Sequence, residues 1–204
     1  MKELSAPILG KPILSALERQ QVLYLINRAD HVRDKAIIAL FAESGLRLSE
    51  LVDITFDRID LTNQSVRVVG KGRKEAYAFF GSLSKQYLQE WLKQYQPSDS
   101  SNIWGVNQWG ITSMLKRLHE ETGLPCNPHT FRRTFACLLR KAGVDKMTIK
   151  DLGRSESLEM VQRYTRSVSF HDSYFNSEPI TKVILSKIRV IGVSGSRAWN
   201  LLRP

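Results

Sequence analysis

An almost entirely apolar stretch at residues 35–44 constrains the fold of this chain more than any other segment. Apart from its first and last positions, nearly every residue in it is hydrophobic. A helix that is hydrophobic on all sides is buried inside a protein. Gly45 follows directly and suits the left-handed residue that ends many helices. We therefore predict a buried helix over 35–44, and a new helical turn over 46–52.

The rest of the chain has mainly helical periodicity, interrupted by one short hairpin. Ser15–Glu18 has the spacing of a capping box and predicts the start of a first helix. Residues 65–69 and 76–80 are typical of short strands joined by a basic, glycine-containing loop. Further helices are predicted at 84–95, 108–121, 128–142, 146–152 and 158–165. The predicted fold is α+β, mainly helical with one small antiparallel β-hairpin.

The predicted helix over 128–142 has two distinct faces. One is apolar and comprises Phe131, Phe135, Leu138, Leu139 and Ala142. The opposite, mostly basic face comprises His129, Arg132, Arg133, Ala136 and Arg140.

The charge balance favours a polyanionic partner. Thirty Lys and Arg residues against twenty Asp and Glu give this 204-residue chain a net charge of +10. Basic side chains that neutralise phosphates release counterions, so the surplus favours nucleic acid. Ribosomal and membrane-surface proteins share this bias, so charge alone does not decide the partner. Neither a membrane-spanning run nor a secretory signal is evident, and we expect a cytoplasmic protein.

The cysteine pattern does not favour a metal centre or a disulfide framework. Cys126 and Cys137 lack the paired spacing of a zinc site, and the chain has four histidines. We expect both cysteines to behave as small buried hydrophobes, and we expect no cofactor.

Several segments contain the residue types that metal-free cleavage of a phosphodiester requires. Such cleavage needs a nucleophile, fixed positive charge at the phosphate oxygens and a proton for the leaving 5′ oxygen. Arginine suits the phosphate because its planar fork binds two oxygens and stays protonated. The candidate segments are 45–51, 70–72, 129–132 and 163–165.

Taken together and in this order, these segments resemble the tyrosine recombinases, the phage-integrase family of site-specific DNA recombinases. The family pattern is an arginine after a helix-ending Gly-Leu, a lysine in a β-hairpin, a His-x-x-Arg pair, a His or Trp, and a tyrosine in an Arg-Tyr-Thr-like context. The similarity spans about residues 14–174. It implies the DNA breaking-rejoining catalytic fold and strand transfer through a 3′-phosphotyrosyl intermediate, without metal or ATP.

The resemblance also implies a role for each matching residue. Tyr164 would be the nucleophile, and Arg47 and Arg132 would hold the scissile phosphate. His129 would assist proton transfer at Tyr164, and Lys71 would protonate the leaving 5′ oxygen.

One position departs from the family pattern. Where the family usually has Leu-Gly-His before the tyrosine helix, this chain has Leu-Gly-Arg-Ser. Counting from Gly153 places Arg154 at the His/Trp position, whereas counting back from Tyr164 places Ser155 there. We expect Arg154 to fill the position and to donate to a phosphate oxygen, with Ser155 as the alternative.

The resemblance further implies domains and partners. Residues 1–175 would form the catalytic domain, and 176–204 a tail. Family members usually carry a core-binding domain ahead of the catalytic one, whereas here about a dozen residues precede the first helix. We expect double-stranded DNA as partner, and dimers or tetramers on it. An apolar cluster in the tail could dock on a neighbouring protomer; its residues are Val183, Ile184, Leu185 and Ile188.

Each assignment has a simpler alternative. Arg47 could form an ordinary surface ion pair with Glu50, His129 could merely cap its helix, and Tyr164 could pack in a core. For the whole protein, the alternatives are a non-catalytic DNA-binding remnant of an integrase and a type IB topoisomerase-like enzyme that relaxes supercoils.

Overall fold

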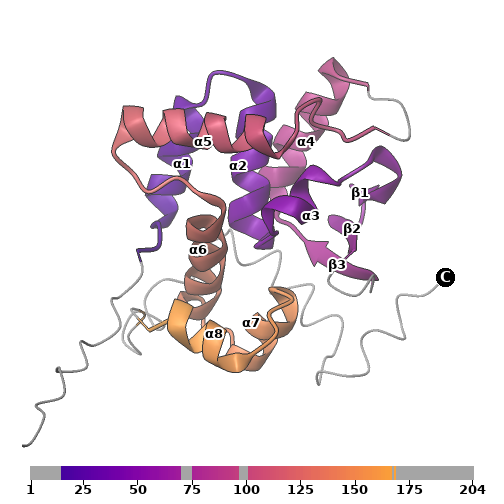
Figure 1. Ribbon diagram of the computed structural model, residues 1–204. Helices are drawn as coiled ribbons and strands as arrows, with labels where there is room; N and C mark the ends of the chain where they lie inside the picture. Colours follow the sequence, from indigo (N-terminus) through magenta and orange to yellow (C-terminus); the bar gives the residue numbers. More distant parts are fainter. Residues whose placement is uncertain (1–14, 70–74, 97–100, 167, 169–204) are drawn as a thin grey trace, which may run out of the picture.

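The computed structural model describes residues 15–69, 75–96, 101–166 and 168, which form a mainly helical protein with a small sheet at one side (Figure 1). This confirms the predicted α+β class. In chain order the elements are α1 (Arg19–Arg28), α2 (Val32–Ser44), α3 (Leu48–Val52), the 3₁₀ turn η1 (Phe56–Arg58), β1 (Ile59–Asp60), β2 (Ser65–Val69), β3 (Glu75–Phe79), α4 (Ser82–Gln94), α5 (Gln108–Thr122), α6 (Pro128–Lys141), α7 (Lys146–Leu152) and α8 (Leu158–Tyr164).

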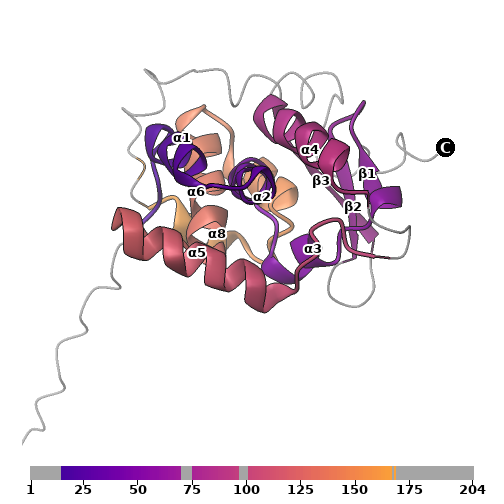
Figure 2. The ribbon, with the colours of Figure 1, turned by 90° about the horizontal axis from the view of Figure 1, so that it is seen from above.

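Helix α2 lies at the centre of the main core, as the apolar run at residues 36–42 within it predicts. Its residues 36–44 are all buried, and it packs against α1, α4 and α6. Seen from above, α2 is enclosed by these three helices, and the sheet lies beyond α4 (Figure 2). Gly45 ends the helix with φ +60°, the left-handed conformation that its position predicts.

Helix α1 begins later than the sequence pattern predicts. The prediction of a capping box at Ser15–Glu18 is wrong, because Glu18 is the N-cap and pairs reciprocally with Gln21. The carbonyl oxygen of Ser15 instead accepts a hydrogen bond from Nε of Arg133 in α6, at 2.9 Å. A distant helix, which local spacing does not reveal, therefore determines how the chain enters α1.

The sheet has three antiparallel strands in the order β1-β2-β3. Its two longer strands agree with the predicted hairpin within one residue, and the register pairs Arg67 with Tyr77. The two-residue strand β1 was not predicted, since it is too short to show a period; it pairs Ile59 with Val66. The predicted hairpin loop, including Lys71, lies outside the described residues.

Helix α6 connects two hydrophobic cores. Phe131 stacks on Phe41 of the main core, with ring centroids 5.8 Å apart. One turn later, Phe135 joins a second, smaller core formed with α7 and α8. The predicted division of α6 into an apolar and a basic face is partly wrong, because Arg132 and Ala136 are buried at 5% and 4% exposure. Elements on both sides of α6 cover part of the face that the sequence pattern assigns to the basic residues.

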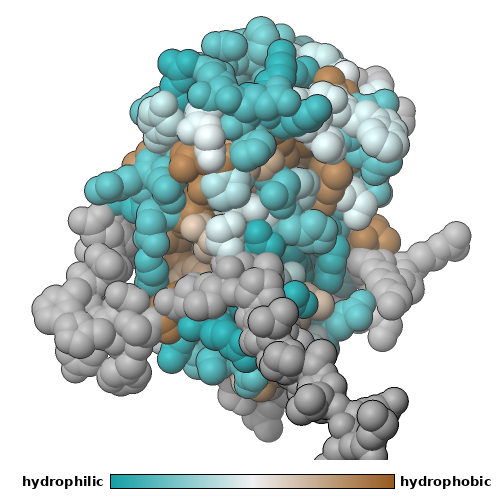
Figure 3. Space-filling view, turned by 60° about the vertical axis from the view of Figure 1, so that its left-hand side comes forward, coloured by the Kyte–Doolittle hydropathy of each residue, from teal (hydrophilic) through white to brown (hydrophobic). Residues whose placement is uncertain are grey.

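The face of the molecule drawn in Figure 3 is largely hydrophilic. In one view hydrophilic side chains cover most of the coloured surface, with smaller hydrophobic areas between them (Figure 3). Within the described ranges, no helix combines the length and hydrophobicity needed to cross a bilayer.

Candidate active site

Arg47 lies at the junction of α2 and α3, where the left-handed Gly45 turns the chain out of the core. It is the N-cap residue of α3, and its backbone N–H donates to Oε2 of Glu50 at 2.8 Å. Its Nη1 donates to Oε1 of the same carboxylate at 2.7 Å. The Arg47 side chain is 37% exposed, so it retains a surface that a ligand can reach.

Arg132 is the most enclosed of the predicted phosphate ligands that the structure describes. From α6 it donates to the backbone oxygens of Gly45 and Gly153 and, at 3.3 Å, to the hydroxyl of Ser155. Burial and the neighbouring cations Arg47 and Arg154 lower the pKa of Arg132 to about 10. The guanidinium group is therefore still positively charged at neutral pH.

Arg154 lies in the bend between α7 and α8 and points inward. Its Nη1 donates to the carbonyl oxygen of Leu152 at 2.8 Å, and its Nη2 approaches Oε2 of Glu50 at 3.3 Å. The same Nη2 lies 3.4 Å from the carbonyl oxygens of Ser44 and Gly45. The side chain is only 8% exposed, and within the described part of the chain its Nε has no hydrogen-bond partner. Burial lowers the pKa of Arg154, an effect that Glu50 opposes.

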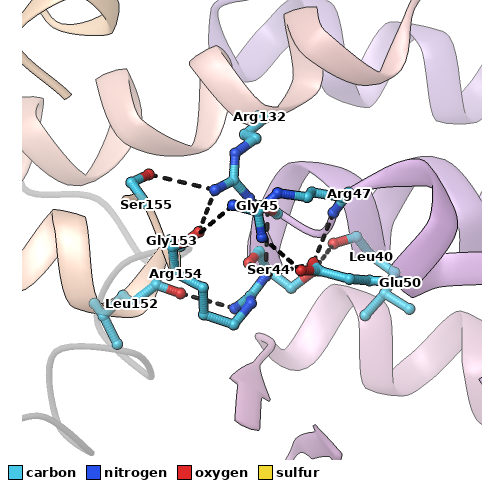
Figure 4. A network of polar contacts seen from close by, with 10 residues as sticks. All are labelled: Leu40, Ser44, Gly45, Arg47, Glu50, Arg132, Leu152, Gly153, Arg154 and Ser155. Carbon is cyan, nitrogen blue, oxygen red and sulfur yellow. Dashed lines mark hydrogen bonds and ion pairs between the residues drawn. The ribbon is translucent and has the colours of Figure 1, made fainter. Parts of the chain in front are cut away.

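Glu50 is the acidic centre of this network, which Figure 4 shows from close by. Burial by itself raises the pKa of this carboxyl group, but Arg154 and Arg47 outweigh burial and the pKa lies below its usual value. From the sequence, Glu50 was expected only as a possible surface ion-pair partner of Arg47. The signal for a larger role was its position three residues after an N-cap, which is the spacing of a capping box.

The three arginines reach one place from three distant parts of the chain. Arg47 and Arg154 converge on Glu50, and Arg132 and Arg154 both approach Gly45 (Figure 4). Carbonyl oxygens at the ends of α2 and α7 surround the guanidinium groups, which is favourable because a helix C-terminus carries partial negative charge. Three cations beside one carboxylate leave the site positively charged, and such a site suits an anionic phosphate.

His129 lies in the first turn of α6, one turn before Arg132, and its side chain is exposed. It does not cap the helix. The N-cap is Asn127, whose side-chain oxygen accepts from the backbone N–H of Thr130 at 2.9 Å. The imidazole is therefore accessible from solvent.

Tyr164 is the last residue of α8 and is half-buried against the second core. Its backbone oxygen accepts a hydrogen bond from Sγ of Cys137 in α6, at 3.0 Å. The Tyr164 side chain also influences Arg132 electrostatically. A negative charge on the Tyr164 oxygen raises the pKa of Arg132, and this is the smallest of several influences on that pKa. Tyr164 has a further environment besides the second core. It also lines an open cavity of about 810 Å³ whose basic residues are Arg140, Lys146, Arg163 and Arg166.

The cysteines lie in the interior, as predicted. Both are buried, and burial raises the pKa of Cys126 to about 11. Over the described residues, no cluster of three or more His, Cys, Asp or Glu side chains has an arrangement that could hold a metal ion.

Comparison with known proteins places the chain in a family. The model of the phage integrase family matches residues 15–170. Tyrosine recombinase XerC of Lactobacillus delbrueckii subsp. bulgaricus is 34% identical over 148 residues, which are 66% of this chain and 50% of that protein. Tyrosine recombinase XerA of Saccharolobus solfataricus is 30% identical over 163 residues, covering 79% of this chain and 55% of the relative. The chain thus spans about half the length of these relatives.

Solved structures show the same fold. An XerA recombinase superposes with a TM-score of 0.69 at 19% identity, covering 91% of this chain and 67% of the other. An XerH site-specific recombinase bound to a palindromic difH substrate superposes with a TM-score of 0.65 at 19% identity, covering 89% of this chain and 54% of the other. Since the family model matches most of its length, the chain belongs to the phage integrase family.

Proposed function

We propose that this chain is the catalytic part of a site-specific DNA recombinase that cleaves and rejoins DNA through Tyr164. The observation that carries the proposal is the convergence of Arg47 and Arg132 on the bend at residues 153–155, which leads directly into the helix ending at Tyr164. Two fixed cations and a nucleophile therefore belong to one small region of the fold. Residues 1–175 would form this catalytic unit.

In the proposed reaction the Tyr164 hydroxyl oxygen attacks the phosphorus, and the bond from phosphorus to the 5′ oxygen breaks. The phenolic proton passes to His129, which is exposed at the start of α6. Lys71 gives a proton to the leaving 5′ oxygen. The product is a 3′-phosphotyrosyl link, and attack by a 5′ hydroxyl of a second strand reverses the step. One phosphodiester is exchanged for another, so the cycle requires neither metal nor ATP.

Arg47 and Arg132 would neutralise the non-bridging oxygens as charge builds up in the transition state. Arg132 is well suited because its guanidinium orientation is already determined by the backbone oxygens of Gly45 and Gly153. Because Arg132 is preorganised in this way, little free energy is needed to reorient it when the phosphate binds. Ser155, the alternative to Arg154 for the His/Trp position, has its hydroxyl 3.3 Å from Nη2 of Arg132.

The proposed partner is double-stranded DNA. The net charge of +10 supports this, as do the difH-bound XerH structure and a Tn1549 transposon integrase solved with circular intermediate DNA, which share the fold. Self-association into dimers or tetramers on DNA is part of the proposal. The predicted role of the tail residues 183–188 in docking on a neighbouring protomer stays a prediction, because they lie outside the described residues.

A nicked suicide duplex tests the chemistry. Duplexes that bind the protein at low salt are first selected by filter retention. A nick is then placed near the candidate cleavage site, so that the short fragment bearing the new 5′ hydroxyl diffuses away and the covalent adduct accumulates. We expect an adduct with the wild-type protein and none with Tyr164→Phe. Tyr24→Phe is the matched control, since Tyr24 is an exposed residue of α1 and should leave the adduct unchanged.

Two outcomes would contradict the proposal in different ways. Retention of DNA by the wild-type protein without any adduct would indicate a non-catalytic DNA-binding remnant. Relaxation of a supercoiled plasmid through a Tyr164 adduct, without products joined between two sites, would indicate topoisomerase-like activity instead of recombination.

A further inference from the structure

We infer that Arg154 is a positioning residue that acts inward on Glu50 and thereby leaves Arg47 free to bind a phosphate. This inference rests on the proposed function, because it concerns how Arg47 is presented to DNA. It also assigns Arg154 a role different from direct donation to a phosphate oxygen, which is the role that its place in the sequence predicts.

The contacts of Arg154 point into the protein. Its two terminal nitrogens are directed at the carbonyl oxygens of Leu152, Ser44 and Gly45 and at the Glu50 carboxylate. With 8% of its side chain exposed, Arg154 has almost no surface left for a DNA backbone. The Arg47 side chain, at 37% exposed, has such a surface.

The charges explain why an inward arginine is useful here. Glu50 is buried, and its Oε1 accepts from Nη1 of Arg47 at 2.7 Å. A buried carboxylate with Arg47 as its sole cation would compete with a phosphate for that guanidinium group. Arg154 places a second cation 3.3 Å from the other oxygen, Oε2. The carboxylate is thereby neutralised from both sides, and positive charge remains at Arg47 for a ligand.

The backbone at Arg154 contributes separately from its side chain. The residue has φ +52°, a left-handed conformation that glycine adopts more readily than arginine. In this bend the backbone oxygen of Arg154 accepts from Nη2 of Arg47 at 2.9 Å, and that of Gly153 accepts from Arg132. Substitution by glycine is compatible with the bend and removes the whole side chain while it keeps the backbone oxygen, so Arg154→Gly separates the contribution of the side chain from that of the backbone.

The decisive experiment combines Arg154→Gly with Glu50→Gln. Four proteins are compared in single-turnover cleavage of the suicide duplex: wild type, each single variant and the double variant. We expect Arg154→Gly to slow cleavage by about 10–100-fold, the effect typical of losing the outer partner of a functional group. The double variant should cleave faster than Arg154→Gly and within about threefold of Glu50→Gln alone, because the uncompensated charge is then absent. Because Glu50→Gln would also relieve any destabilisation caused by the buried carboxylate, cleavage is compared at a temperature at which all four proteins are folded.

Salt dependence distinguishes an inward role from direct contact with DNA. A lysine or arginine that contacts a phosphate contributes about one unit to the slope of log affinity against log salt concentration. We expect the double variant to keep the wild-type slope, because Arg47 is then free again to contact the phosphate. A slope of the double variant reduced by about one unit, or a double variant as slow as Arg154→Gly, would overturn the inference.

Arg154→Lys is a second variant, which keeps the inference testable if Arg154→Gly does not fold. Lysine keeps one positive charge beside Glu50 but cannot also reach the three carbonyl oxygens, so we expect it to cleave faster than Arg154→Gly. Equal loss in both variants, with both folded, would overturn the inference.

If the wild-type protein forms no adduct, the proposed function fails, and the inference is then tested by DNA affinity alone. Arg154→Gly should weaken binding, and Glu50→Gln should restore it; a double variant that binds no better than Arg154→Gly would contradict the inference.

Discussion

Arg47 donates a hydrogen bond from Nη2 to the backbone oxygen of Arg154 at 2.9 Å, although 107 positions separate the two residues in the chain. This contact joins the start of α3 to the bend that follows α7. Arg132 donates to the neighbouring backbone oxygen of Gly153 in the same bend. Both proposed phosphate ligands are therefore supported by the segment that leads to the proposed nucleophile.

Loss of the Arg132 guanidinium group should impair catalysis strongly. We expect Arg132→Ala to reduce single-turnover cleavage by about 10²–10³-fold, the effect of removing one preorganised donor from a transition state. The suicide-duplex assay measures this directly. Arg133→Ala is the matched control, because Arg133 is the next residue of α6 but donates to Ser15 and Thr130. Near-wild-type cleavage by Arg132→Ala would refute its assignment to the phosphate.

The predicted acid role of Lys71 can be tested by changing the leaving group. Lys71→Ala should slow cleavage by roughly 10²–10⁴-fold on an ordinary duplex, which is the usual contribution of general acid–base catalysis. A duplex with sulfur in place of the bridging 5′ oxygen needs no proton to leave, so it should be cleaved at close to the wild-type rate. Lys74→Ala serves as the control from the same predicted loop. Equal defects on both substrates would assign Lys71 a role other than proton donor.

Gly45 should tolerate no side chain. It has φ +60°, and a Cβ built there would lie 2.5 Å from Cδ1 of Phe135. We expect Gly45→Ala to lower the free energy of unfolding by roughly 2–5 kcal/mol, from left-handed strain together with overpacking. Gly123 has φ +69° but no atom within 4 Å of such a Cβ, so Gly123→Ala should cost only about 1–2 kcal/mol. Urea denaturation compares the two, and equal losses would show that the contact with Phe135 is unimportant.

Glu43 should make stability depend on pH in an unusual direction. Burial raises the pKa of this carboxyl group above 4.5, although Ser84 and Gly81 donate hydrogen bonds that lower it. Because the folded state then holds the proton more tightly than the unfolded state, this group's contribution is fully present below pH 4.5 and falls as pH rises through the folded pKa. Glutamine stays neutral throughout that range.

We therefore expect the stability of Glu43→Gln, relative to wild type, to increase between acidic and neutral pH. Urea denaturation at several pH values measures the difference. Glu90→Gln, which alters an exposed residue of α4, is the control. A stability difference between Glu43→Gln and wild type that is constant with pH would contradict the prediction.

Features governed by neighbours in sequence could be predicted. The apolar run that became α2 and the glycine that ends it depend on local periodicity and on a single backbone conformation. The same holds for α5, where Gly123 follows the last turn with φ +69°. The resemblance to a family also rested on short local segments, and the match of the phage integrase family model over residues 15–170 confirms it.

Only the tertiary structure determined how the polar residues are used. The helical pattern assigns Arg132 to a basic face, yet its acceptor in Gly45 lies 87 positions away and buries it. The role predicted for Arg154 is to donate to a phosphate oxygen, and the structure adds an ion pair with Glu50, 104 positions away, that no local pattern indicates. Local sequence determines where a helix begins and ends and which residues are basic. Which carbonyl or carboxylate receives each guanidinium group depends on how distant elements pack, and no local pattern encodes that.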